Sequence, residues 1–127
     1  IYPPDNYIVR VICNYLEDIY RVEDSLLRQD DIKLLKRKDY IKNPKESGYR
    51  SLHLVIEVPI FLSDRTYHMP VEIQIRTVAM DTWASLEHEL KYKRVEEMPE
   101  HVAQELKDCA KMMAELDDTM QSIHRML

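Results

Sequence analysis

A basic loop in front of a strand is the first place where residue types and spacing suggest chemistry. Residues 40–53 read Tyr-Ile-Lys-Asn-Pro-Lys-Glu-Ser-Gly-Tyr-Arg-Ser-Leu-His and contain Gly48, the single glycine among 127 residues. A chain that uses glycine once is expected to need it there, for a positive φ or a close backbone approach. Cations beside aromatic rings suit a planar ligand that carries phosphates. A solvated basic turn has the same composition, so this stretch alone leaves both interpretations open.

A second polar group lies on the strands that follow this loop. Residues 51–61 and 67–76 both alternate between apolar and polar side chains, and residues 63–66 have the composition of a turn. The pattern predicts a β-hairpin with a four-residue turn, one apolar face of which is covered by helices. The opposite face gathers His53, Glu72, Gln74 and Arg76.

Two carboxylates are candidate metal ligands. The sequence has neither a glycine-rich phosphate loop nor a CxxC or HExxH metal motif. Side-chain cations and a carboxylate-held Mg²⁺ would then have to bind phosphates, and such a site needs only one or two carboxylates. Asp5 and Glu72 are the candidates. An aspartate in a proline-containing segment is more often a turn residue, and Glu72 also fits an ordinary solvent-facing strand position.

Several further elements position these groups. Residues 8–13 predict a buried strand, in which Arg10 either points outward, the favoured interpretation, or holds a ligand. Residues 16–29 predict a helix and residues 32–38 a strand. Residues 77–94 predict a helix with Thr77 as N-cap. Its inward side chains are expected to be Val78, Trp83, Leu86 and Leu90.

The C-terminal segment predicts a long helix that begins near Pro99. Its apolar residues alternate in spacings of four and three, as in a heptad seam. This seam packs either on the domain's own sheet or on another subunit. Its methionines and cysteine specify a coiled coil weakly, so we favour packing on other helices over a free-standing coiled coil. It consists of Val102, Leu106, Cys109, Met113, Leu116, Met120, Ile123 and Leu127.

Composition limits the classes of function. The length fits one domain, and the net charge of -5 argues against a general DNA- or RNA-binding protein. No apolar run is long enough to span a membrane. Cys13 and Cys109 lie in apolar patterns and are interpreted as buried free thiols, so a cytoplasmic location is expected. The sequence begins at Ile1 rather than methionine, and we therefore expect an N-terminal part to be missing.

Three blocks of sequence resemble a known family. They are residues 40–53, the run Glu-Ile-Gln-Ile-Arg-Thr at 72–77 and the run Trp-Ala-Ser-Leu-Glu-His at 83–88. Together they resemble the synthetase domain of RelA/SpoT-type proteins, most of all the small single-domain alarmone synthetases, over about residues 5–94. The resemblance implies an α+β, nucleotidyltransferase-like fold with a mixed sheet of about four to five strands, packed helices and C-terminal helices. Residues 1–94 would form the synthetase core and residues 95–127 a C-terminal helix on the core or a neighbouring subunit.

The resemblance also implies an activity, that of a GTP pyrophosphokinase. Such an enzyme transfers the β,γ-pyrophosphate of ATP to the 3′-OH of GDP or GTP, with Mg²⁺, and makes the alarmones ppGpp and pppGpp of the stringent response. Tyr49 would stack on guanine, Arg10 on adenine, and Glu72 would be general base and Mg²⁺ ligand together with Asp5. The phosphates and riboses would be bound by Lys38, Lys42, Lys45, His53, Gln74 and Arg76, with support from Glu87 and His88.

Alternatives remain at this stage. Ile8 stands where the family usually has glycine, which would crowd the metal site and favours a non-catalytic guanine-nucleotide-binding or regulatory module. The heptad seam favours an oligomerising role, and the small synthetases imply a homo-oligomer, with a tetramer favoured. An alarmone or single-stranded RNA is a possible regulator. Hydrolase activity is not expected, because the long family members place it in a separate domain.

Overall fold

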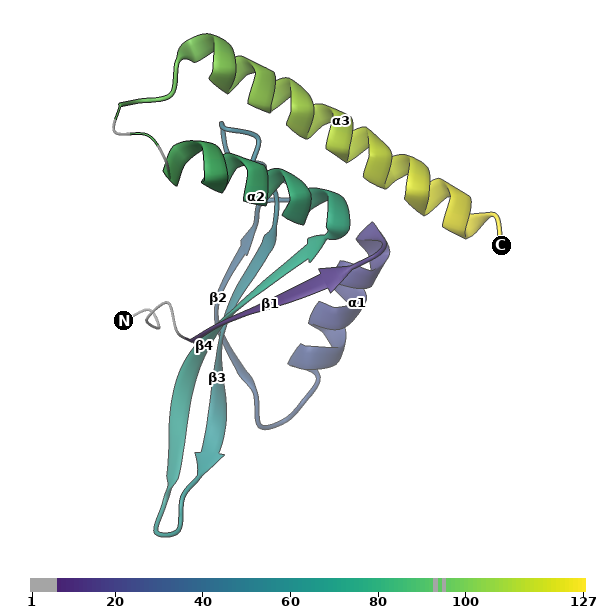
Figure 1. Cartoon of the computed structure of the whole chain (residues 1–127). Coiled ribbons are helices and arrows are strands. Elements are labelled where there is room, and N and C mark those ends of the chain that lie inside the picture. The colour runs from purple at the N-terminus through teal and green to yellow at the C-terminus, as the bar shows by residue number, and fades with distance from the viewer. Residues whose placement is uncertain (1–6, 93, 95) are drawn as a thin grey trace.

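The computed structural model describes residues 7–92, 94 and 96–127. These form a mixed sheet of four strands with three helices (Figure 1). The predicted α+β class is therefore confirmed. In chain order the elements are β1 (Ile8–Cys13), α1 (Leu16–Leu27), β2 (Lys33–Asp39), β3 (Leu52–Phe61), β4 (Thr66–Thr77), α2 (Val78–Tyr92) and α3 (Glu100–Arg125).

The sheet has the strand order β1-β4-β3-β2, with β1 parallel to β4 and the other pairs antiparallel. β3 and β4 form the predicted hairpin, in which Phe61 pairs with Thr66, so the four-residue turn lies one position earlier than expected. The hairpin extends beyond its neighbours as a two-stranded arm (Figure 1), because β1 pairs with β4 only from Glu72 onward. The centre of the sheet is therefore the part where all four strands lie side by side.

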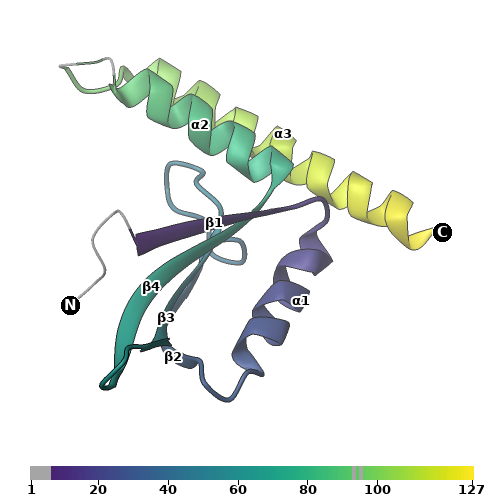
Figure 2. The ribbon, with the colours of Figure 1, turned by 60° about the horizontal axis from the view of Figure 1, so that its bottom comes forward.

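One face of the sheet is covered by α1 and forms the main core (Figure 2). Leu52, Leu54 and Ile75 are completely buried there, together with Ile19 from the helix. These are the positions that the period of two assigned to the apolar face. The opposite face is consequently the polar one.

The N-terminal strand differs from the prediction. β1 was expected to be a buried strand, but Cys13 is its only fully buried residue, and Val9 and Ile12 are exposed. The reason is its position: β1 lies at the sheet edge and has a neighbour on one side only. A β-branched run indicates a strand but does not distinguish an edge from a centre.

The inward face of α2 was also predicted wrongly, although its start was right. The backbone N–H of Met80 donates to Thr77 Oγ1 at 3.2 Å, which confirms the N-cap. Of the four side chains expected inward only Trp83 is buried, whereas Val78, Leu86 and Leu90 are exposed. Ala79 and Met80 are buried instead, because the direct passage from β4 into the helix turns these positions toward the protein.

α3 runs beside α2 in both views (Figures 1 and 2). Trp83 Nε1–H donates to the carbonyl oxygen of Leu106 at 2.8 Å, and Leu106 is buried as the seam predicts. The C-terminal half of the seam is wrong: Leu116, Ile123 and Leu127 are exposed. Asp117 and Gln121 are buried in their place, because their partners on the core are polar.

Two smaller observations complete the fold. Cys13 is buried as expected, whereas Cys109 is only half-buried, and both are free thiols. Among the described residues no helix is long and apolar enough to cross a membrane.

Candidate active site

Two rows of side chains cross all four strands on the open face of the sheet. In the first row Arg10 pairs with Gln74, Gln74 with His53, and His53 with Lys38. In the second row Glu72 pairs with Ile8 on β1 and with Val55 on β3. Glu72 therefore lies in the middle of the sheet, with an arginine toward one edge and lysines toward the other.

Arg76 is the centre of a hydrogen-bond network at the end of β4. Its guanidinium is buried, with the residue 5% exposed, and it donates to Asp81 Oδ1 at 3.1 Å and Tyr49 Oη at 2.7 Å. It also reaches Gln74 Oε1 at 3.2 Å and Ser51 Oγ at 3.4 Å. We call these five residues the Arg76 network. A buried cation with this many acceptors is held in one orientation.

The network continues from Arg76 to the general-base candidate. Gln74 accepts from Arg76 through Oε1 and donates through Nε2 to Glu72 Oε2 at 3.0 Å. This hydrogen bond fixes one oxygen of the Glu72 carboxylate. No hydrogen bond from a described residue to the other oxygen, Oε1, is recorded. This oxygen is therefore available to a ligand.

Tyr49 links the network to His53. The Tyr49 hydroxyl oxygen lies 2.8 Å from His53 Nε2, and Tyr40 packs edge-on against both rings. Burial lowers the pKa of His53 to about 4, which outweighs the opposing effect of the Glu72 charge. His53 is therefore neutral at pH 7.

The loop that bears Tyr49 has both of the features that a single glycine suggested. Gly48 has a φ of 104°, and a Cβ at this position would lie 2.7 Å from Ala110 Cβ on α3. The loop is closed by hydrogen bonds from Gly48 N–H to Lys45 O at 2.9 Å and from Lys45 N–H to Tyr49 O at 3.1 Å. Lys45 Nζ lies 4.9 Å from the Tyr40 ring centre and 5.0 Å from that of Tyr49.

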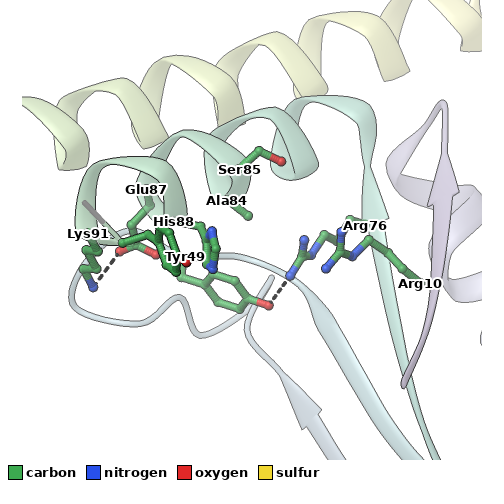
Figure 3. Close-up of a pocket in the computed structure, with 9 residues that line it drawn as sticks. Arg10, Tyr49, Arg76, Ala84, Ser85, Glu87, His88 and Lys91 are labelled. Atoms are coloured by element: carbon green, nitrogen blue, oxygen red, sulfur yellow. Dashed lines mark hydrogen bonds and ion pairs between the residues drawn. The ribbon is translucent and has the colours of Figure 1, made fainter. Parts of the chain in front are cut away.

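The hydrogen-bonded Tyr49–His53 pair connects the walls of two cavities, because Tyr49 lines one and His53 lines the other. The larger, of about 610 Å³, lies between the end of the sheet and α2 (Figure 3). Tyr49 faces α2 residues across this cavity, and its hydroxyl points toward Arg76 (Figure 3). The lining residues are Arg10, Tyr49, Arg76, Ala84, Ser85, Glu87, His88, Lys91 and Tyr92.

The smaller cavity, of about 160 Å³, lies on the sheet itself. It is lined by Lys36, Lys38, Tyr40, His53, Val55 and Glu72. A carboxylate, an imidazole and two lysines around one space can bind phosphate oxygens and a reacting hydroxyl together. The arrangement of one cavity for an aromatic ring and one for phosphates fits nucleotide chemistry.

Comparison with known proteins gives the family. Residues 4–97 match the family described as "Region found in RelA / SpoT proteins". The chain belongs to the RelA/SpoT family.

The most similar proteins found include two GTP pyrophosphokinases of Bacillus subtilis. The chain is 47% identical to YwaC over 117 residues, which cover 92% of this chain and 56% of that protein. It is 40% identical to YjbM over 115 residues, which cover 91% of this chain and 54% of that protein. The chain thus spans about half the length of the curated relatives that it matches.

Solved structures agree with this result. The small alarmone synthetase 2 from Bacillus subtilis superposes with a TM-score of 0.91 at 46% identity, covering 94% of this chain and 65% of that one. The small alarmone synthetase 1 from Bacillus subtilis, bound to its product pppGpp, gives a TM-score of 0.87 at 38% identity, covering 94% and 62%. The fold of the RelA/SpoT synthetase region is therefore present over nearly the whole chain.

Most of the predicted site residues of this RelA/SpoT chain come together. Arg10, Tyr49, Arg76, Glu87 and His88 line the larger cavity, and Lys38, His53 and Glu72 line the smaller one. Gln74 bonds to Arg76 and Glu72, and Lys45 lies over the rings of Tyr49 and Tyr40, which line the larger and the smaller cavity. Lys42 is the exception. Its Nζ lies 5.5 Å from the Tyr20 ring centre on α1, so it is directed away from both cavities. Asp5 lies outside the described residues.

Sequence reasoning missed several residues of the site. Asp81 accepts from Arg76 and lies 3.8 Å from Arg10 Nη1, which makes it the link between the two arginines. Asp81, Ser85 and Tyr92 follow a helical spacing with the predicted His88 and form a polar stripe with it on α2. Lys36 lies two residues before Lys38, on the same face of β2. Both spacings were visible in the sequence and indicate these positions.

The residues around Glu72 fit a Mg²⁺ ion that is also bound by a nucleotide. Among residues 7–92, 94 and 96–127 there is no group of three or more His, Cys, Asp or Glu that would hold a metal alone. A Mg²⁺ site shared with phosphates needs one or two carboxylates, and Glu72 offers a carboxylate oxygen that Gln74 does not occupy. The donor set is thus compatible with a substrate-bridged ion.

Proposed function

We propose that the protein is a GTP pyrophosphokinase that transfers the β,γ-pyrophosphate of ATP to the 3′-OH of GDP or GTP, with Mg²⁺. The observation that supports this most is the position of Glu72, between Arg10 and the lysines of β2 on the open face of the sheet. The relatives support the same reaction. Two of them are named GTP pyrophosphokinases, and a solved neighbour is bound to pppGpp.

The two cavities would bind different parts of the substrates. The guanine base would stack on Tyr49 in the larger cavity, and Lys38 and Lys45 would bind the acceptor's phosphates. Arg10, which is half-exposed and paired with Asp81 only at 3.8 Å, would be available to stack on adenine. The 3′-OH would then meet the ATP phosphates above Glu72.

The reaction is an in-line displacement at the β-phosphorus of ATP. The 3′ oxygen forms a bond to this phosphorus, the bond to the oxygen of the α-phosphate breaks, and AMP leaves. Glu72 accepts the proton of the 3′-OH with the carboxylate oxygen that Gln74 leaves free. Mg²⁺, when bound, neutralises charge on the phosphate oxygens. Arg76 and Gln74 keep the Glu72 carboxylate in position.

The test is an assay of the full-length protein with ATP, Mg²⁺ and GTP or GDP. We expect a 3′-pyrophosphorylated product from wild type and a loss of at least about a hundredfold in Glu72→Gln, which removes the base. Glu57→Gln is the matched control, because Glu57 lies on the adjacent strand and pairs with His68, outside both cavities. Absence of product from wild type, or undiminished product from Glu72→Gln, would contradict the proposal.

A second candidate is a module that binds guanine nucleotides without turnover. Ile8 favours it, because this side chain is the direct neighbour of Glu72 in the second row, where the resemblance leads one to expect glycine. A branched side chain beside the carboxylate restricts the room for a metal and its phosphates. GTP binding that does not change when Mg²⁺ is removed, in a protein without product formation, would support this candidate.

We further propose a cytoplasmic location. We also propose that the protein is a homo-oligomer, with a tetramer favoured, in which α3 contributes to the contact between subunits. The outer side of α3 supports the oligomer, because Met112, Leu116 and Ile123 are exposed apolar residues on this helix. Sedimentation of the full-length protein tests it. Leu116→Lys with Ile123→Lys should lower the mass of the assembly, whereas Gln104→Lys should not. The division at residue 94 and regulation by an alarmone or single-stranded RNA stay predictions.

A further inference from the structure

Arg76, Tyr49 and His53 form a hydrogen-bonded chain whose protons can be placed. Arg76 Nη2 lies 2.7 Å from the Tyr49 hydroxyl oxygen, and this oxygen lies 2.8 Å from His53 Nε2. A guanidinium group has donors only, so the Tyr49 oxygen must accept from Arg76. The first link of the chain therefore has a fixed direction.

The second link follows from the proton that the Tyr49 hydroxyl still has to donate. Within the described part of the chain, Arg76 and His53 are the two hydrogen-bond partners recorded for this hydroxyl. If His53 Nε2 were the donor, the phenolic proton would be left without an acceptor in a half-buried position, which costs free energy. Tyr49 therefore donates, and Nε2 accepts.

This direction decides the form of the imidazole. With Nε2 accepting, the proton of a neutral His53 is on Nδ1. Burial lowers the pKa of His53 to about 4, so the neutral ring is the relevant form near pH 7. His53 lines the smaller cavity with Lys38 and Glu72, and Nδ1–H is the one ring donor it retains for a ligand there.

We propose that Tyr49 is a positioning residue: its hydroxyl, oriented by Arg76, fixes His53 in the Nδ1–H form, so that His53 donates a hydrogen bond to a phosphate oxygen and does not act as a base. This inference rests on the proposed function for the identity of the ligand. Tyr49 thereby acts in both cavities, with its ring in the larger and its hydroxyl on a residue of the smaller. A single side chain would thus contact the guanine of the acceptor nucleotide and also position the residue that binds the reacting phosphates.

The first experiment needs no enzymatic activity. Full-length protein labelled with ¹⁵N in histidine is examined by long-range ¹H–¹⁵N correlation, and the His53 signals are assigned with His53→Gln. We expect Nδ1 protonated and Nε2 unprotonated in wild type, and a shift toward the Nε2–H form in Tyr49→Phe. A protonated Nε2 in wild type, or an unchanged His53 pattern in Tyr49→Phe, would overturn the inference.

The second experiment separates the hydroxyl from the ring. Tyr49→Phe keeps the aromatic face for guanine, so KM for GTP should stay within about twofold while kcat falls about tenfold, the size expected for one well-placed hydrogen bond. Tyr67→Phe is the matched control, because Tyr67 lies on the hairpin arm, outside both cavities. An unchanged kcat, or a loss confined to KM, would contradict the positioning role.

The two measurements also separate this inference from the proposed function. If wild type makes no product while His53 shows the Nδ1–H form and responds to Tyr49→Phe, the positioning by Tyr49 holds and the pyrophosphokinase assignment fails. If wild type is active but His53 has Nε2 protonated, the assignment holds and the positioning role is wrong.

Discussion

Two buried charges, Arg76 and Asp117, lie close together in the fold but are satisfied to different degrees. Arg76 has hydrogen-bond acceptors on all three guanidinium nitrogens. Asp117, only 2% exposed, accepts from Thr77 Oγ1 at 2.8 Å, and Arg50 Nη1 remains 3.6 Å away, beyond hydrogen-bond distance. We call Asp117, Thr77 and Arg50 the Asp117 network. Its Arg50 Nη1 has no hydrogen-bond partner within the described residues.

The difference indicates what each network contributes. A fully paired buried charge holds its neighbours in one geometry, which the proposed reaction would require around Glu72 and Tyr49. A buried carboxylate with one short hydrogen bond and a distant cation stabilises the fold little. The two networks lie back to back, since Tyr49 and Arg76 belong to one and the adjacent Arg50 and Thr77 to the other.

Removing the charge from the satisfied network should have the largest effect. In Arg76→Met the side chains of Tyr49, Gln74 and Asp81 lose a buried partner, and we expect the free energy of unfolding to fall by about 3 kcal/mol. Urea denaturation followed by circular dichroism measures it. Arg21→Met is the control, because Arg21 forms only exposed ion pairs and should change stability by less than about 0.5 kcal/mol. Equal effects of the two variants would contradict the difference between the regions.

Substitution of Gly48, in the loop that precedes Tyr49 and Arg50, should have the second largest effect on stability. Gly48→Ala places a methyl group 2.7 Å from Ala110 Cβ and forces an L-residue to a φ of 104°, so we expect a loss of about 2 kcal/mol. Ala110→Gly in the same chain should relieve the contact but not the backbone strain. A double-mutant cycle should therefore show a coupling of about 1 kcal/mol between the two positions. Strictly additive effects would show that the contact is not the cause.

Acid should lower the free energy of unfolding through the protonation of His53. The pKa of His53 in the folded protein, about 4, lies below the ordinary value of 6.5, so its neutral form contributes stability above pH 6.5 that is lost as the pH falls toward 4. We expect a loss of about 1 kcal/mol over this range, with allowance for partial exposure. His53→Gln should remove this part of the pH dependence. His101→Gln, at an exposed position of α3, should leave it unchanged.

The Asp117 network should show the smallest effect, with the opposite sign. Burial raises the pKa of Asp117 above its ordinary 3.8, so Asp117 favours the folded state below that pH and loses this contribution as the pH rises. The stability of wild type relative to Asp117→Asn should therefore decrease from about pH 3.5 upward, by less than about 1 kcal/mol. Glu115→Gln, at an exposed position of α3, provides the control. A relative stability that increases with pH would mean that Arg50 pairs strongly with Asp117.

The sequence predicted the side chains of the Arg76 network that lie on strands better than those of the Asp117 network and α3. Alternation in residues 52–58 and 71–76 was enough to place His53, Glu72 and Gln74 on one face, because side-chain direction in a strand depends only on the period of two. Gly48 was correctly identified as a special backbone position, because the chain uses no other glycine.

The side chains of the Asp117 network and α3 depend on partners that are distant in the sequence. Asp117 and Gln121 on α3 face inward because they accept hydrogen bonds from Thr77 Oγ1 and from the backbone N–H of Glu17. An apolar heptad pattern contains no information about those donors. Lys42 points to Tyr20 because Asp39 Oδ1 accepts the backbone N–H groups of Ile41 and Lys42 and turns the chain toward α1. Composition alone placed Lys42 with the other cations of the loop.

Trp83 gives the protein a built-in optical reporter. It is the only tryptophan in the sequence, and its indole N–H is bound to the carbonyl oxygen of Leu106 on α3. The same ring lies close to Gly48, where an added Cβ would be 3.4 Å from Trp83 Cζ2. Its fluorescence therefore senses two contacts at once, the seating of α3 and the loop that ends in Tyr49. Detachment of α3 would expose the indole to water and shift its emission to longer wavelength.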